Sequence, residues 1–182
     1  MAYRLKLDWK SKTYEGRTPS DTDWARMAAY IDGEGSILIN TRSTRKDYAT
    51  EASGFYLRVT VANTDVRLPI WLKETFGGSY KDANTPKYYE GQNWKRAYHW
   101  NTASNRAAWI LFNCLPYFVM KREQAQIGCS LQESMNKEIV GRSLPEDVVN
   151  ERRELKSRLL FLKRKGAQAQ VEQERELQAA VS

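Results

Sequence analysis

The sequence predicts an α+β fold in which a curved antiparallel β-sheet is backed by helices on one face. This prediction depends on the order of two periodicities along the chain. Segments with apolar residues at helical spacing alternate with pairs of segments in which every second residue is apolar, the period of a strand. The resulting order is helix, two strands, helix, two strands and further helices, or αββαββα with extra C-terminal helices. Such an order favours antiparallel strand pairs with the helices gathered on one side.

The first helix is predicted to begin near Ser20, because Pro19, Ser20 and the acids that follow supply the capping chemistry of a helix start. It ends where Gly33 and Gly35 interrupt the pattern. The same rules predict strands at 36–42, 55–61, 79–82 and 94–101, and helices at 65–76, 105–114, 119–136 and 145–165. Beyond Gly166 we expect a marginal helix or a frayed tail.

The length of 182 residues favours one domain with three parts: an N-terminal extension at 1–18, a core at 19–137 and a C-terminal helical extension at 138–182. No apolar run is long enough to cross a bilayer, and the charged N-terminal stretch does not resemble a secretory signal. We therefore expect no membrane partner and no secretion, with the chain in a prokaryotic cytoplasm near the nucleoid, or in an organelle matrix if an organelle encodes it. Cys114 and Cys129 are expected to be buried thiols.

The positive charge is concentrated in the middle of the chain. The net charge is +7, residues 1–35 and 123–182 are each neutral, and residues 36–122 carry thirteen basic and six acidic side chains. A basic central module is the electrostatic pattern expected of a surface that binds nucleic-acid phosphates. A solvated basic face is the alternative, and charge alone does not decide between them.

The chemistry-bearing segment is Met27-Ala28-Ala29-Tyr30-Ile31-Asp32-Gly33-Glu34-Gly35-Ser36. Two small residues in the helix permit a close approach by another helix. Two carboxylates separated by glycine then bring acid and bare backbone to one point, which is a suitable arrangement for a hard cation. Taken alone, the acids and glycines could simply mark a helix end with solvated carboxylates. Here they end an apolar helix and begin the basic module, which favours a functional role.

This segment resembles the LAGLIDADG motif, the signature of the homing endonuclease family of that name. Two further matches follow in order: 61–65 (Val-Ala-Asn-Thr-Asp), where the family keeps a polar residue near the catalytic water, and 115–125, which is similar to the family's segment of proline, apolar run, lysine and Gln-Ala. The Gly77-Gly78-Ser79 turn also fits, so the resemblance covers roughly 24–125. Glu34 stands where aspartate is more familiar, and Asn63 where some relatives have glutamine.

The resemblance implies a nuclease that cuts both strands of double-stranded DNA at a long near-palindromic site and leaves 3′ overhangs. Glu34 and the carbonyl of Gly33 are then expected to hold Mg²⁺, with no other small-molecule cofactor. Asn63 would orient the attacking water, and Lys121 would offset developing negative charge or tune the water network. Asp32 is expected to brace the motif turn rather than to bind metal.

A single copy of the motif implies, in this family, a homodimer whose motif helices pack together at the two-fold axis. The predicted interface residues are Met27, Ala28, Ala29 and Ile31. The polar face of the sheet is expected to form a DNA-binding saddle in the major groove, which admits a two-stranded ribbon. By alternation, the predicted DNA-binding residues are Ser36, Leu38, Asn40, Arg42, Tyr56, Arg58 and Thr60 from the first strand pair, and Ser79, Lys81, Lys95 and His99 from the second.

Two other functions fit the same fold: an RNA-binding maturase that assists intron splicing, and a DNA-binding regulator that has lost catalysis. The presence of Glu34, Asn63 and Lys121 favours the nuclease over both. His99 is the sole histidine, so the sequence does not favour a histidine-based nuclease site or a Ser-His-Asp triad.

Overall fold

The computed structural model describes residues 8–41, 54–82, 96–136 and 145–180, with side chains up to residue 164. Its strands are β1 (Gly35–Thr41), β2 (Phe55–Asn63), β3 (Ser79–Asp82) and β4 (Tyr98–Ala103). The helices are α1 (Asp21–Glu34), α2 (Arg67–Phe76), α4 (Ser104–Cys114), the short 3₁₀ helix η2 (Leu115–Tyr117), α5 (Arg122–Asn136) and α6 (Glu146–Ala180). The predicted α+β fold and its αββαββα order are therefore confirmed.

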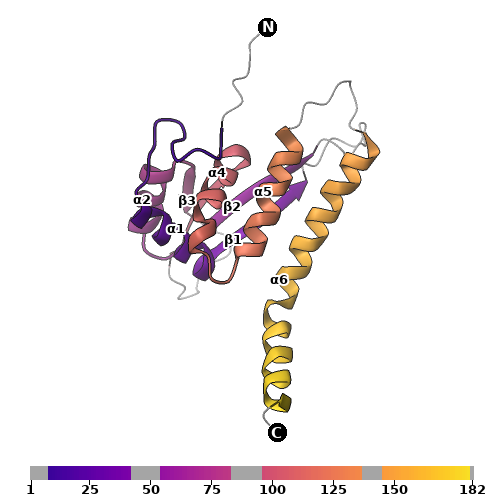
Figure 1. Ribbon diagram of the computed structural model, residues 1–182. Coiled ribbons are helices and arrows are strands. Elements are labelled where there is room, and N and C mark those ends of the chain that lie inside the picture. Colours follow the sequence, from indigo (N-terminus) through magenta and orange to yellow (C-terminus); the bar gives the residue numbers. More distant parts are fainter. Residues whose placement is uncertain (1–7, 42–53, 83–95, 137–144, 181–182) are drawn as a thin grey trace, which may run out of the picture.

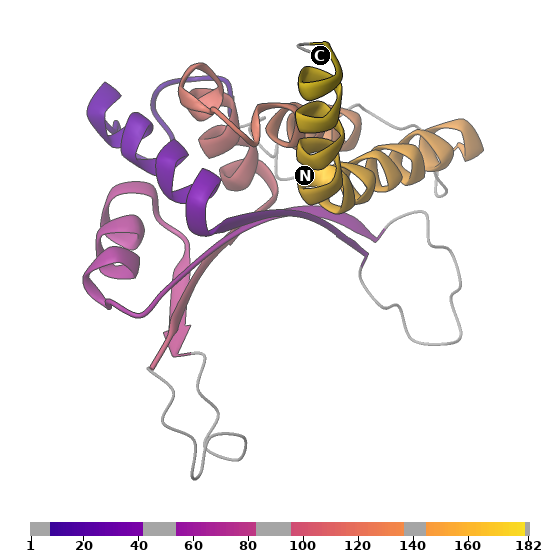
Figure 2. The same cartoon turned by 90° about the horizontal axis from the view of Figure 1, so that it is seen from below.

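The four strands form one antiparallel sheet in the order β1-β2-β4-β3. Figure 2 shows this sheet as an arch, with the helices on its convex side and the concave side open. In Figure 1, α5 and α6 run side by side across the same part of the sheet. The curvature follows from the right-handed twist of paired strands, and here it produces the predicted saddle.

The core lies between the convex face of the sheet and the helices. Leu57, Val59 and Val61 alternate along β2 and are buried, as the strand period requires. Three fully buried tryptophans join the elements, and the indole rings of Trp24 in α1 and Trp109 in α4 meet edge to face at 5.0 Å between centroids. The third, Trp100 in β4, donates its indole N–H to the carbonyl of Gly77 at 2.9 Å.

The core also takes side chains from both predicted extensions. Trp9 and Tyr14 are buried in it, and the Tyr14 ring stacks on Trp109 at 5.2 Å. Leu159 of α6 is buried at the other side of the same cluster. The three predicted segments therefore share one core in the part of the chain that the structure describes.

Several predicted boundaries differ from the observed ones. The helix predicted from residue 65 begins at Arg67, which places Pro69 in the first turn, where a helix needs no amide hydrogen. The strand predicted at 94–101 is β4 at Tyr98–Ala103. Helix α6 continues through Gly166 to Ala180, beyond the predicted end at 165.

Capping and thiol predictions are confirmed. Ser20 and Asp23 form a reciprocal capping box, in which the Asp23 amide donates to the Ser20 hydroxyl at 3.2 Å and the Ser20 amide donates to the Asp23 carboxylate at 3.0 Å. Cys114 and Cys129 are buried free thiols, and burial raises the pKa of Cys129 to about 12. Among the described residues, none of the helices is long and apolar enough to cross a membrane.

Gly128 of α5 packs closely against Leu111 of α4 and Leu57 of β2. A Cβ atom there would lie 2.9 Å from the Leu111 Cδ1 atom and 2.9 Å from the Leu57 Cδ1 atom, and both leucines are fully buried. Gly128→Val should therefore lower the free energy of unfolding by about 1–3 kcal/mol through overpacking. Ser130→Val, at an exposed position of the same helix, should change it by less than about 0.5 kcal/mol. Chemical denaturation measures both, and equal losses would contradict this packing.

Candidate active site

The C-terminal end of α1 is the centre of the candidate site. The chain passes from Glu34 directly into β1, and a Cβ atom on Gly35 would lie 2.5 Å from the Ile31 Cα atom and 2.8 Å from the Ile31 carbonyl oxygen. Only glycine fits there, although its backbone is extended (φ −89°, ψ 163°). The second motif glycine is thus required by space rather than by conformation.

Lys121 donates hydrogen bonds to the carbonyls at the C-terminal end of α1, and this end is called closed below. Its ammonium group donates to the carbonyls of Ile31, Asp32 and Gly35 at 2.6, 2.8 and 2.9 Å. These acceptors lie at the negative end of the helix dipole, where the last carbonyls have no intrahelical partner. Burial nevertheless lowers the pKa of Lys121, and the nearby Asp32 carboxylate opposes that effect.

Asp32 makes the reciprocal connection. Its buried carboxylate accepts the backbone N–H groups of Val119 at 2.8 Å, Met120 at 3.4 Å and Lys121 at 2.9 Å. The bracing role predicted for Asp32 fits these contacts. Helix α5 begins at Arg122 and not at the predicted residue 119, and the carbonyl of the preceding Lys121 accepts the Ala125 amide at 2.9 Å.

Glu34 and Asn63 meet beside this closed end. The Asn63 side-chain amide donates to the Glu34 carboxylate at 2.5 Å, and its own carbonyl oxygen accepts the Asp65 backbone N–H at 2.8 Å. The two residues are 29 positions apart, at the ends of α1 and β2. The structure therefore brings together two of the three predicted catalytic side chains, while Lys121 contacts the carbonyls on either side of Glu34.

The donor atoms at this point suit a hard cation. Glu34 offers an exposed carboxylate, and Gly33 contributes one of the last carbonyls of α1. The three carbonyls that Lys121 contacts are those of residues 31, 32 and 35, so the Gly33 carbonyl is outside that set. Oxygen donors at the negative end of a helix are what Mg²⁺ prefers. No cluster of three His, Cys, Asp or Glu side chains able to hold a metal occurs in the described ranges.

The strand register places every predicted DNA-binding residue within the described ranges on one face of the sheet. Ser36 pairs with Thr60, Leu38 with Arg58 and Asn40 with Tyr56, so these side chains lie opposite the buried ones. The register continues from Thr60 through Asn101 to Ser79, and from Ala62 through His99 to Lys81. This is the concave face in Figure 2. Arg42 and Lys95 lie outside the described residues.

Asn101 and Arg58 also lie on this concave face. Asn101 stands between Thr60 and Ser79, donates its amide to the Ser79 carbonyl at 3.3 Å, and was missed by the sequence analysis. It follows the buried Trp100, and this alternation was the available signal. The Nε atom of Arg58 is buried without a hydrogen-bond partner among the described residues.

The predicted dimer interface is wrong at three of its four positions. Met27, Ala28 and Ile31 are fully buried in the core of their own protomer. Of the four predicted interface residues, only Ala29 is exposed, and the other exposed residues of α1 are Asp21, Thr22, Arg26, Tyr30, Gly33 and Glu34. The motif helix has an apolar stripe, and that stripe packs inward on α4 and β2.

Two features define the class of fold: the arched sheet, and a helix that ends in Glu34 and continues directly into the edge strand β1. The chain has the fold of the LAGLIDADG homing endonucleases, which confirms at the level of the fold the resemblance seen in the sequence. No protein-family model matches the chain, and a search of curated protein sequences found no match.

Three solved structures illustrate the similarity. The homing endonuclease I-CvuI, crystallised with a DNA target in 2 mM Mg that left the DNA uncleaved, has a TM-score of 0.60 and 19% identity over 78% of this chain and 83% of its own. The archaeal intron-encoded homing endonuclease I-Vdi141I with DNA gives 0.59 and 14% over 78% and 84%. The LAGLIDADG homing endonuclease I-GzeII with its DNA target gives 0.53 and 16% over 73% and 43%.

The contacts of Lys121 identify it as a residue that positions the site. Lys121→Met should remove a donor from the carbonyls of Ile31, Asp32 and Gly35, although the Ile31 carbonyl keeps the Gly35 amide, and should lower the free energy of unfolding by about 1–3 kcal/mol. Arg164→Met removes the same charge from an exposed position of α6 and should have little effect. Thermal unfolding measures both variants. A Lys121→Met protein as stable as the wild type would show that the lysine does not hold the turn.

Proposed function

We propose that this chain is a homing endonuclease that cuts both strands of double-stranded DNA at a long near-palindromic site, using Mg²⁺ and leaving 3′ overhangs. The observation that carries the proposal is the contact between Glu34 and Asn63 at the closed end of α1, at the edge of a concave polar sheet. The neighbouring folds support it, since I-CvuI, I-Vdi141I and I-GzeII are each described in complex with DNA.

The sheet binds DNA through its concave face. Arg58 and Lys81 supply positive charge, and Asn40, Thr60 and Asn101 supply hydrogen-bonding groups for base edges in the major groove. Charge contacts to phosphates provide affinity, and contacts to base edges provide sequence discrimination.

Glu34 and the Gly33 carbonyl would hold the metal ion, supported by I-CvuI structures that contain Mg or Ca. Bound Mg²⁺ would supply the Lewis acid that polarises the phosphate and lowers the pKa of the attacking water. Asn63 holds the Glu34 carboxylate through one N–H of its amide, and its second N–H would orient that water. Lys121 and Asp32 keep the helix end closed, so Glu34 stays in position while DNA binds.

The proposed enzyme is a homodimer joined through the exposed side of α1. A Cβ atom on Gly33 would meet no atom within 4 Å, so nothing in the protomer requires a glycine there, although glycine costs a helix about 1 kcal/mol relative to alanine. Ala29 and Gly33 are spaced four residues apart, which lets a second helix approach closely. Nearby, Val119 and Met120 are 88% and 63% exposed beside the end of α1.

The number of motif copies supports the same assembly. The sequence contains one copy of the motif, and the region aligned with I-GzeII, 73% of this chain, covers 43% of that protein. Two copies would bring two Glu34 carboxylates together, one for each strand of the DNA. Because these carboxylates would repel each other and the phosphates, divalent cations are needed between them.

The activity is tested with a duplex library of candidate insertion sites in Mg²⁺. The wild-type protein should cut a site in both strands, whereas Glu34→Gln should slow the cut about a thousandfold or more while DNA affinity is kept or improved. Glu74→Gln, which alters an exposed carboxylate on α2, is the matched control. Ca²⁺ should allow binding without turnover.

The outcomes separate the alternatives. Full cleavage by Glu34→Gln would contradict the assigned site. Sequence-specific DNA binding without any cleavage in Mg²⁺ would identify a regulator, and binding restricted to structured intron RNA would identify a maturase.

The assembly is tested by adding volume on the exposed side of α1. Ala29→Leu and Gly33→Leu should convert the dimer to a monomer, because overpacking a close helix contact costs about 1–3 kcal/mol for each site and the two-fold axis repeats it. Circular dichroism should show the fold intact. Gln126→Leu, on an exposed position of α5, should remain dimeric in sedimentation. A wild-type monomer that cuts both strands would overturn the dimer.

A further inference from the structure

The C-terminal helix α6 packs firmly against the edge of the sheet nearest the site. Leu159 is 2% exposed, and Leu155 and Leu162 pack against the same core. Helix α6 therefore has a fixed place beside β1, which is an edge strand of the sheet. Side chains on this part of α6 therefore lie close to those of β1.

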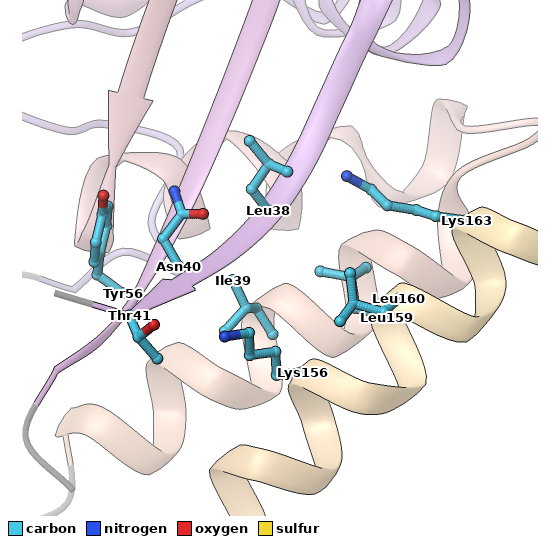
Figure 3. A pocket seen from close by; sticks show the side chains of 9 residues that line it. All are labelled: Leu38, Ile39, Asn40, Thr41, Tyr56, Lys156, Leu159, Leu160 and Lys163. Carbon is cyan, nitrogen blue, oxygen red and sulfur yellow. The ribbon is translucent and has the colours of Figure 1, made fainter. Parts of the chain in front are cut away.

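A groove of about 310 Å³ lies between α6 and β1. Figure 3 shows Leu159 and Leu160 on the helix side, Leu38 on the strand side, and a lysine toward each end. Lys156 lies beside Ile39 and Thr41, whereas Lys163 points to the part of β1 nearer the start of the strand. One lysine of α6 therefore approaches the end of β1 that follows Glu34.

Lys163 reaches around the strand edge to the concave face. Its ammonium group donates to the Ser36 hydroxyl at 3.0 Å. Ser36 is the first side chain of β1 on the concave face and lies two residues after Glu34. Because Lys121 donates to the carbonyl of the preceding Gly35 at 2.9 Å, two ammonium groups converge on neighbouring residues of one strand.

Lys163 lacks the carboxylate neighbour that Lys121 has in Asp32. Among the described residues, Lys163 has no carboxylate within ion-pair distance. Burial lowers its pKa, and repulsion from Lys121 lowers it further. A half-buried ammonium group without a paired anion costs free energy, and a bound anion would recover it. The Ser36 hydroxyl accepts one of the three N–H groups of Lys163, which leaves capacity for phosphate oxygens.

We propose that Lys163 binds a phosphate of the DNA backbone next to the cleavage site, so that α6 is part of the DNA-binding surface. This inference rests on the proposed function. It adds a residue 127 positions distant from Ser36 to the predicted contacts of the sheet. The C-terminal extension then serves two purposes, because it covers the edge of β1 and delivers a cation to the concave side.

The test measures DNA affinity against salt concentration in Ca²⁺, on a duplex first selected by cleavage in Mg²⁺. Each lost phosphate contact should reduce the slope of log K against log salt by about 0.9, or about 1.8 for two sites in a dimer. Lys163→Met should show this reduction, and Lys163→Arg should retain the wild-type slope. Arg164→Met removes the same charge from the next, exposed position and should change the slope by less than half as much.

Thermal unfolding without DNA distinguishes binding from a structural role. Lys163→Met should be at least as stable as the wild type, because it removes a partly desolvated charge. A less stable variant with an unchanged salt slope would overturn the inference, as would equal slope changes in Lys163→Met and Arg164→Met. A wild-type protein that neither binds nor cleaves any duplex would overturn the proposed function as well, so the two failures are distinguishable.

Discussion

The structure of the site depends on how the end of α1 is closed. Lys121 donates to three carbonyls at this end, and Asp32 within it accepts three amides from the segment that contains Lys121. A helix terminus without partners would leave polar groups unpaired where water is restricted. These reciprocal bonds join residues almost ninety positions apart in the chain, and they fix α1, the start of β1 and the start of α5 relative to one another.

Function is arranged around this closure. Glu34 lies between the carbonyls that Lys121 contacts, and Asn63 reaches it from the end of β2. The sheet that begins at Gly35 turns its polar side chains to the concave face, while the opposite set fills the core. The same short segment therefore connects the candidate catalytic acid to the candidate DNA-binding face, and the proposed contact of Lys163 joins it at Ser36.

The sequence predicted those features that depend on local periodicity. Strand alternation placed Ser79, Lys81 and His99 on the same face as Thr60, and the register confirms it, because a period of two assigns faces without knowledge of the partner strand. Helix α1 shows the limit of this reasoning. Its apolar stripe could serve the protomer core or a partner helix, and only the packing shows that Met27 and Ile31 face inward.

Other features depend on contacts between distant parts of the chain. Helix α5 begins three residues after the predicted start, and the amides of Val119 and Lys121 before it bind the Asp32 carboxylate, a contact that no local pattern shows. Lys163 carries no local signal of its approach to Ser36. The nearest clue was the leucine stripe at 155, 159 and 162, which predicted that this face of the helix packs but not that a neighbouring lysine reaches the sheet edge.

The proposed binding of a divalent metal ion at the closed end of α1, against DNA, is tested directly by metal-directed cleavage of the protein. Fe²⁺ takes the place of Mg²⁺ in the complex with target DNA, and ascorbate and peroxide then generate hydroxyl radicals at the ion. If the ion binds there, protein fragments should end close to Glu34, should require DNA and should be absent from Glu34→Gln. Fragments that end far from α1, or a pattern near Glu34 that the substitution leaves unchanged, would contradict it.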